Sequence, residues 1–142
     1  MSSVTPADVL ARRSQLILNG DADGLAALFA PDAVLESSFA GPPGTPVRLE
    51  GREAIREYSQ RVMASPLRLE DFAVTELYQT QDPEVVIAEV RAKATVTATG
   101  RSLTATSIQI LRIREGHIEL FRDFADPRVL DDVTDNHVPI GD

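Results

Sequence analysis

Residues 86–98 read VIAEVRAKATVTA, and this stretch decides the fold class. Apolar residues stand at every second position from Val86 to Val96, and most residues between them are charged or carry a hydroxyl group. A period of two is typical of a β-strand with one face in a core and the other in water. The apolar positions hold only alanine and valine, so the buried face should leave room beside the sheet. This favours a cavity over a completely filled core.

The segments around this strand complete a sheet. Turns are predicted at Thr99-Gly100 and at Glu115-Gly116, because each glycine follows a run that alternates in polarity. Short turns between long strands predict antiparallel neighbours. The predicted strands are 33–39, 67–78, 86–98, 102–114 and 117–124.

The N-terminal half has helical patterns instead. Thr5 can cap a helix, Pro6 suits its first position, and Asp8 completes a capping box. Asn19-Gly20 would end this helix, and Asp21 can cap the next one. The predicted helices run from about 5 to 19, from 21 to 31 and from 51 to 65.

Helices followed by hairpin-connected strands predict an α+β fold. We expect one domain over residues 1–142, with three N-terminal helices packed on one face of a curved antiparallel sheet and a pocket between them. Residues 127–142 contain two prolines and several acidic residues, so we expect an extended C-terminal tail.

The composition excludes several classes of function. The formal net charge is −8, which argues against binding nucleic acid or an anionic membrane surface. There is no cysteine, no run of apolar residues long enough to span a membrane and no pattern of a secretory leader, so we expect a cytoplasmic protein. His117 and His137 lack partners at metal-ligand spacing, and Gly41–Gly44 is not followed by the lysine of a phosphate loop. We therefore predict neither a metal nor a cofactor.

Three strings carry a resemblance to a known family: DGLAALFAPDAV at 23–34, GREAIREY at 51–58 and GHIELFRDFADP at 116–127. In this order, the chain resembles the SnoaL-like members of the nuclear transport factor 2-like superfamily, which also includes ketosteroid isomerases and limonene-epoxide hydrolases. The resemblance implies a cone-shaped α+β barrel, open at one end, and usually a homodimer. The same scaffold carries isomerases, polyketide cyclases, dehydratases, epoxide hydrolases and non-catalytic binding modules, so function must be argued from pocket residues.

Asp123 is the first candidate catalytic residue. Side chains alternate along the last predicted strand, and by analogy with the isomerase scaffold the face of Phe121 and Asp123 looks into the cone. A carboxylate flanked by Phe121 and Phe124 would be partly desolvated, which raises its pKa and suits proton transfer. The resemblance implies an acid/base role, as in the cyclases, or activation of water, as in the epoxide hydrolases. The alternative is that Asp123 pairs with Arg122 or with another basic side chain near the rim.

Gln109 is the second candidate, because it interrupts an apolar row on the strand before. A buried amide must find partners. It could donate a hydrogen bond to a developing enolate oxygen, or it could make a structural bond across the sheet. The predicted substrate-binding residues around this pair are Ser37, Phe39, Tyr58, Ser107 and Phe121.

Two departures from the resembled enzymes limit the assignment. Ser37 stands where ketosteroid isomerases carry a catalytic aspartate, which counts against their mechanism. The middle strand has no aspartate two residues after an arginine, so the epoxide-hydrolase set is incomplete. Tyr58 is more simply a pocket wall than a donor to substrate.

The outward face of the last two strands is also predicted to be apolar, through Ile108, Ile110, Ile118 and Leu120. A second copy of the chain would cover it, giving a homodimer.

We carry three functional hypotheses. The first is cofactor-free proton-transfer chemistry (cyclase, isomerase or dehydratase) on a small apolar carbonyl compound. The second is a non-catalytic ligand-binding module with Asp123 paired and the pocket filled. The third is an epoxide hydrolase, which would need a basic partner for Asp123.

Overall fold

The computed structural model describes residues 4–126 of the chain. The predicted tail at 127–142 and His137 therefore lie outside the described residues. The helices are α1 (Pro6–Leu18), α2 (Ala22–Ala27) and α3 (Arg52–Met63), and the strands are β1 (Phe29–Ser37), β2 (Val47–Glu50), β3 (Leu67–Gln79), β4 (Val85–Val96), β5 (Ser102–Arg114) and β6 (His117–Ala125).

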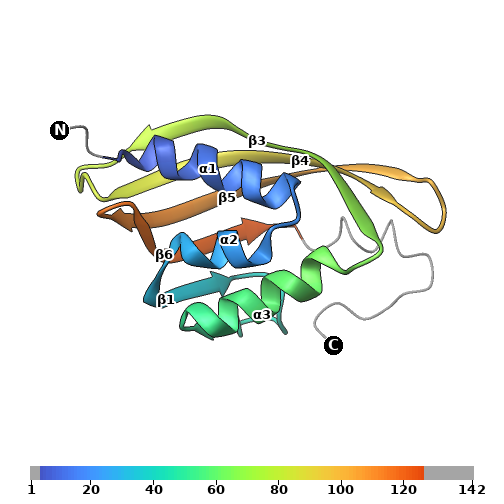
Figure 1. Cartoon of the computed structure of the whole chain (residues 1–142), viewed down its shortest axis with the longest axis horizontal. Coiled ribbons are helices and arrows are strands. Elements are labelled where there is room, and N and C mark those ends of the chain that lie inside the picture. Colours follow the sequence, from blue (N-terminus) through green and yellow to red (C-terminus); the bar gives the residue numbers. More distant parts are fainter. Residues whose placement is uncertain (1–3, 127–142) are drawn as a thin grey trace.

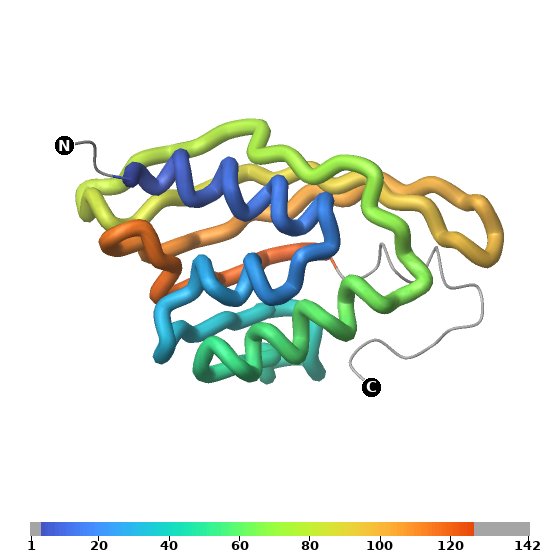
Figure 2. Tube along the Cα trace, in the orientation of Figure 1, coloured from blue at the N-terminus to red at the C-terminus, as the bar shows by residue number. Residues whose placement is uncertain are grey.

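The strands form a curved sheet with the order β2-β1-β6-β5-β4-β3. All three helices lie on the same face of this sheet (Figure 1). The hairpin of β4 and β5 extends beyond the helices, as the tube in Figure 2 shows. The predicted α+β class, with helices over one face of a bent sheet, is confirmed.

Neither of the two pairings of β1 was predicted from the sequence. All neighbouring strands are antiparallel except β1 and β6, which run parallel. Leu28 accepts a backbone hydrogen bond of 2.8 Å from Ile118, and Phe29 is the register partner of Ile118. This pairing starts β1 at Phe29, so α2 ends before Pro31 and the strand begins earlier than residue 33. The short strand β2 then covers the other edge of β1.

The helix starts follow the predicted capping. The backbone N–H of Asp8 donates to Thr5 Oγ1 at 3.1 Å, and the backbone N–H of Thr5 donates to Asp8 Oδ2 at 3.0 Å. Asp21 Oδ1 accepts from the backbone N–H of Gly24 at 2.8 Å. These bonds satisfy N–H groups that a helix start leaves without an internal partner.

The predicted outward position of Ile118 is wrong, because Ile118 is completely buried in the core. A β-bulge between Arg112 and Ile113 shifts the register, so that Ile113 pairs with Ile118 while Arg112 pairs with Leu120. An extra residue in one strand reverses the alternation of faces beyond it. Ile118 therefore points into the core, although Phe121 and Asp123 lie on that same face further along β6.

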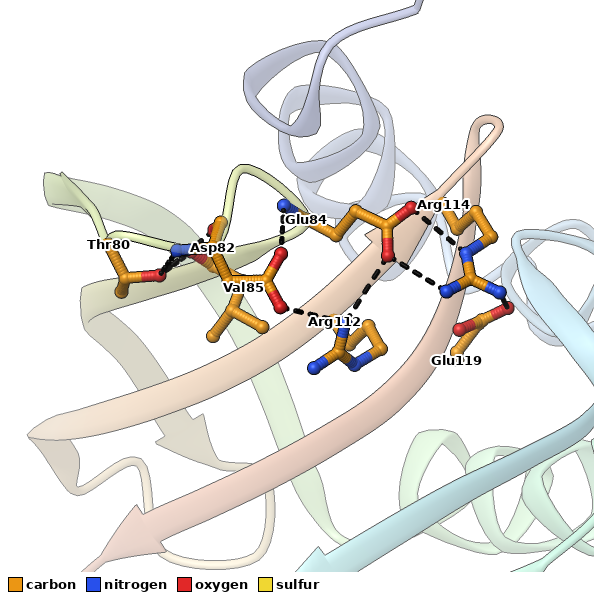
Figure 3. Close-up of polar contacts among 7 residues, drawn as sticks. All are labelled: Thr80, Asp82, Glu84, Val85, Arg112, Arg114 and Glu119. Carbon is orange, nitrogen blue, oxygen red and sulfur yellow. Dashed lines mark hydrogen bonds and ion pairs between the residues drawn. The ribbon is translucent and has the colours of Figure 1, made fainter.

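An ionic network ties three strands together near the N-terminal end of α1 (Figure 3). Glu84, in the turn before β4, accepts hydrogen bonds from Arg112 at 3.2 Å and from Arg114 at 2.9 Å. Arg114 also lies 3.8 Å from Glu119. These side chains are partly exposed, so each pair contributes little by itself, but the network holds the turn against β5 and β6.

Two further properties concern the described part of the chain only. No helix within residues 4–126 has the length and apolar character needed to cross a bilayer. No group of His, Cys, Asp or Glu side chains in the same range gathers as metal ligands would.

Candidate functional site

A cavity of about 610 Å³ lies between the helices and the sheet. Its wall is mostly apolar and includes Leu25, Ile55, Phe72 and Phe121. The small residues Ala92 and Ala94 of β4 also line it, as the alternation of alanine and valine predicted. The cavity reaches the end of α1 at Asn19 and Gly20. A pocket of this size and character suits a small, largely apolar molecule.

Asp123 lies on β6 and lines this cavity. In the sheet it is the register partner of Gln109 on β5 and of Ser37 on β1. Its Oδ1 atom is buried and has no hydrogen-bond partner. Burial raises the pKa of Asp123, while the positive charge of Arg13 and hydrogen bonding from Ser107 and Gln109 lower it, and burial has the larger effect. The carboxyl group is therefore set up to hold or release a proton.

Gln109 is almost fully buried, at 3% exposure, and lines the same cavity. Its Nε2 atom is 3.4 Å from Ser107 Oγ, and its Oε1 atom has no hydrogen-bond partner. Directly opposed residues on antiparallel strands have Cβ atoms about 5 Å apart. One molecule in the cavity can therefore contact both the Gln109 amide and the Asp123 carboxyl group.

Arg13 brings a positive charge to the same space from the middle of α1. The side chain is 1% exposed, and none of its three guanidinium nitrogens has a hydrogen-bond partner within residues 4–126. The guanidinium carbon lies 5.3 Å from the ring centroid of Phe72 and 5.3 Å from that of Phe121. Burial lowers the pKa of Arg13 to about 10, against the opposite effect of Asp123, so the group is still positively charged at neutral pH.

Tyr58 of α3 also lines the cavity. Burial raises the pKa of Tyr58, and the nearby charge of Asp123 adds to the effect. The phenol is therefore protonated at neutral pH, so it can donate a hydrogen bond into the cavity.

The model of the SnoaL-like domain matches residues 11–121, which include the later part of α1, all of α2 and α3, and most of the sheet. This chain belongs to the SnoaL-like family. An uncharacterized PhzA/B-like protein of Pseudomonas aeruginosa is 38% identical over 120 residues, which cover 84% of this chain and 83% of that protein.

Solved structures share the fold of this SnoaL-like chain. An isomerase candidate from Bacillus subtilis superposes with a TM-score of 0.80 at 28% identity, covering 89% of this chain and 90% of that one. A polyketide cyclase candidate from Pseudomonas putida superposes with a TM-score of 0.72 at 15% identity, covering 91% and 97% of the two chains. At that identity, the second likeness concerns the fold alone.

The structure of the SnoaL-like chain brings four of the predicted site residues together. Asp123, Gln109, Tyr58 and Phe121 all line the cavity. Ser107 is not among the lining residues of this cavity and lines the depression beside Phe124 instead, although its Oγ atom lies 3.4 Å from Gln109 Nε2. Ser37 lies beside Asp123 in the sheet but is not among the lining residues.

Phe39 lies elsewhere, which corrects its predicted place in the pocket. Strand β1 ends at Ser37, so Phe39 no longer follows the alternation of the strand. Its ring packs edge-on against Phe124, with 6.1 Å between centroids, in a second depression on the outer side of the sheet.

Arg122 does not pair with Asp123, although the sequence left that possibility open. Its Nε atom lies 3.6 Å from Glu36 Oε1, because Arg122 and Asp123 point to opposite faces of β6.

Arg13 is the functional candidate that the sequence analysis missed. A sequence feature could have revealed it, because residue 13 lies on the apolar stripe of α1. It stands four positions after Val9, three after Leu10 and three before Leu16. A charged residue on a buried stripe needs a partner or a function.

Proposed function

We propose that this SnoaL-like chain is a small-molecule enzyme that moves a proton next to a carbonyl group without a cofactor. The observation that carries the proposal is a partly buried Asp123 that lines a mostly apolar cavity, opposite the amide of Gln109, with a buried Oδ1 atom and a raised pKa. Cyclases, isomerases and dehydratases all begin with such a proton transfer, so the proposal covers this reaction class.

The chemistry follows from the two side chains. The Asp123 carboxylate removes a proton from the carbon beside the carbonyl, and the electron pair of that C–H bond moves onto the carbonyl oxygen as an enolate. A Gln109 N–H donates a hydrogen bond to this oxygen, where charge develops. The protonated Asp123 then returns the proton to carbon. An apolar cavity supports the step, since a desolvated carboxylate is a stronger base.

Two observations support catalysis over a purely binding role. The binding-module hypothesis predicts a pocket filled by side chains, and the cavity of about 610 Å³ is open instead. The isomerase candidate of Bacillus subtilis, at 28% identity, is consistent with the proposed class.

The pH dependence of exchange tests the proposal directly. The enzyme in D₂O should speed the replacement of α-protons of cyclohexanone or α-tetralone by deuterium, followed by NMR. Asp123 acts as a base only when deprotonated, so the rate should fall as the pH drops through its pKa. Because burial raises that pKa, the midpoint should lie above the ordinary aspartate value of about 4. No catalysed exchange, or a midpoint at or below that value, would contradict the proposal.

Epoxide hydrolysis is the second candidate, and Arg13 is the observation that favours it. That hypothesis needed a basic partner for Asp123, and the two side chains interact electrostatically inside the cavity. Asp123 would then remove a proton from water, and the resulting hydroxide would attack one epoxide carbon and break its C–O bond. The alkoxide formed in this way would take the proton back from Asp123, which gives a diol and restores the carboxylate. Formation of a diol from styrene oxide, without α-proton exchange in ketones, would favour this candidate over the first.

We also propose a homodimer through the outer side of β5 and β6. Ile108 is 44% exposed there and Phe39 is 54% exposed, beside a depression of about 620 Å³. Light scattering after gel filtration should show a dimer for the native chain and a monomer for Ile108→Lys. Gln81→Lys, in the exposed turn before β4, is the matched control and should stay dimeric. A native monomer would contradict this proposal.

The single-domain organisation over 1–142 and the cytoplasmic location remain predictions.

A further inference from the structure

We propose that Arg13 is an anion-binding residue and that the molecule bound in the cavity carries a carboxylate group on an otherwise apolar body. The inference rests on the proposed function only in taking this cavity as the substrate site. It narrows the substrate class from carbonyl compounds in general to apolar acids.

The first argument is that the guanidinium is buried without partners. Arg13 is 1% exposed, yet Nε and both Nη atoms lack a hydrogen bond. Transferring an ionised group out of water without compensating hydrogen bonds is strongly unfavourable. A fold keeps such a group when a ligand supplies the missing acceptors.

The second argument is the setting of the group. Phe72 and Phe121 contact the guanidinium through their rings, which stabilise the cation but offer no oxygen acceptor. The N–H groups have no acceptor among residues 4–126, and Arg13 lines the cavity. A guanidinium presents its donors as a rigid planar fork that matches the two oxygens of a carboxylate.

Asp123 does not take that place. Its charge is close enough to affect the pKa of Arg13, but no hydrogen bond joins the two groups, and Asp123 Oδ1 is itself without a partner. A ligand carboxylate on Arg13 would supply the oxygen acceptors that Asp123 does not supply, and it would balance the buried positive charge.

The charge of the wall selects a carboxylate over a phosphate. Among the lining residues, the only other basic side chain is Arg68, which is 71% exposed at the edge of the cavity. One buried cation compensates one negative charge, whereas a phosphate monoester carries up to two near neutral pH. Most of the remaining wall is hydrocarbon, which requires the rest of the ligand to be apolar.

A matched set of probes tests this inference. Calorimetry should show that the native chain binds naphthoate at least about tenfold more tightly than naphthamide or methyl naphthoate of the same ring position. Arg13→Met should abolish this preference, and Arg13→Lys should restore part of it, because lysine keeps the charge but not the fork. Equal affinities of the native chain for acid and amide, no measurable binding of naphthoate, or a preference that survives Arg13→Met would overturn the inference.

A second measurement does not depend on a folded variant. In the native chain, naphthoate should shift the Nε–H NMR resonance of Arg13, while naphthamide should leave it unchanged. An unshifted resonance at saturating naphthoate would overturn the inference.

Asp123→Asn separates this inference from the proposed reaction. This variant should lose α-proton exchange but keep its preference for naphthoate. Exchange that does not depend on Asp123, together with a preference that depends on Arg13, would remove the proposed reaction and leave the carboxylate site standing. Exchange that depends on Asp123, together with a preference for naphthoate that does not depend on Arg13, would remove the carboxylate site alone.

Discussion

Asp123→Asn should lower the rate of α-proton exchange by about 10²-fold or more, because general acid–base catalysis contributes about that much. The amide keeps the size and the hydrogen-bonding capacity of the side chain, but it cannot accept a proton from carbon. The effect should appear in kcat, since the proton moves only during the chemical step. Single-turnover measurements with α-tetralone in D₂O would check it.

Asp32→Asn is the matched control for this prediction. It makes the same chemical change on β1, at an exposed position that does not line the cavity. Its exchange rate should equal that of the native chain. A rate for Asp123→Asn that stays near the native value would show that another group moves the proton.

Leu111→Ala should lower the free energy of unfolding by about 2–5 kcal/mol. Leu111 is completely buried on β5, where its register partners are Val86 on β4 and Phe121 on β6. Removing most of the isobutyl group leaves a cavity that the hydrogen-bonded sheet cannot close. The free energy of burying those carbon atoms is lost, and so are the van der Waals contacts around the cavity. Urea unfolding followed by circular dichroism would measure the change.

Leu103→Ala on the same strand is the matched control. Leu103 is only partly buried, and its partner on β4 is the small Ala94. Its truncation should reduce stability clearly less than truncation of Leu111. Equal losses of stability at the two positions would show that the surroundings of Leu111 are not more tightly packed than those of Leu103.

Much of the fold could be predicted because local patterns specify it. The alternation from Val86 to Val96 fixed the buried face of β4, and the turn at Glu115-Gly116 was found from its glycine. Both residues of that turn have positive φ, 52° and 79°, as a two-residue hairpin turn requires. The caps at Thr5 and Asp21 depend on side chains within three positions, so they are also visible in the sequence.

The features that were missed depend on contacts between distant segments. Nothing local shows that β1 runs parallel to β6, because the pairing joins segments separated by most of the chain. The bulge after Arg112 leaves no clear mark in the sequence, so alternation was continued through it and placed Ile118 on the wrong face. In the site, Asp123 and Gln109 were found as polar residues in apolar rows. Arg13 was overlooked because a helix tolerates arginine well at an exposed position.

The parallel pairing of β1 with β6 also bears on how the protein is made. Synthesis delivers the N-terminal segments first, and contacts between distant segments slow folding. Until β6 has left the ribosome, β1 has only the four-residue β2 as a neighbour, and the apolar faces of the helices lack much of their sheet. Asp123 arrives on that last strand, so the cavity gains its carboxylate and its final wall in the same event. Nascent chains that stop before β6 would therefore expose apolar surface, which makes them natural clients of chaperones.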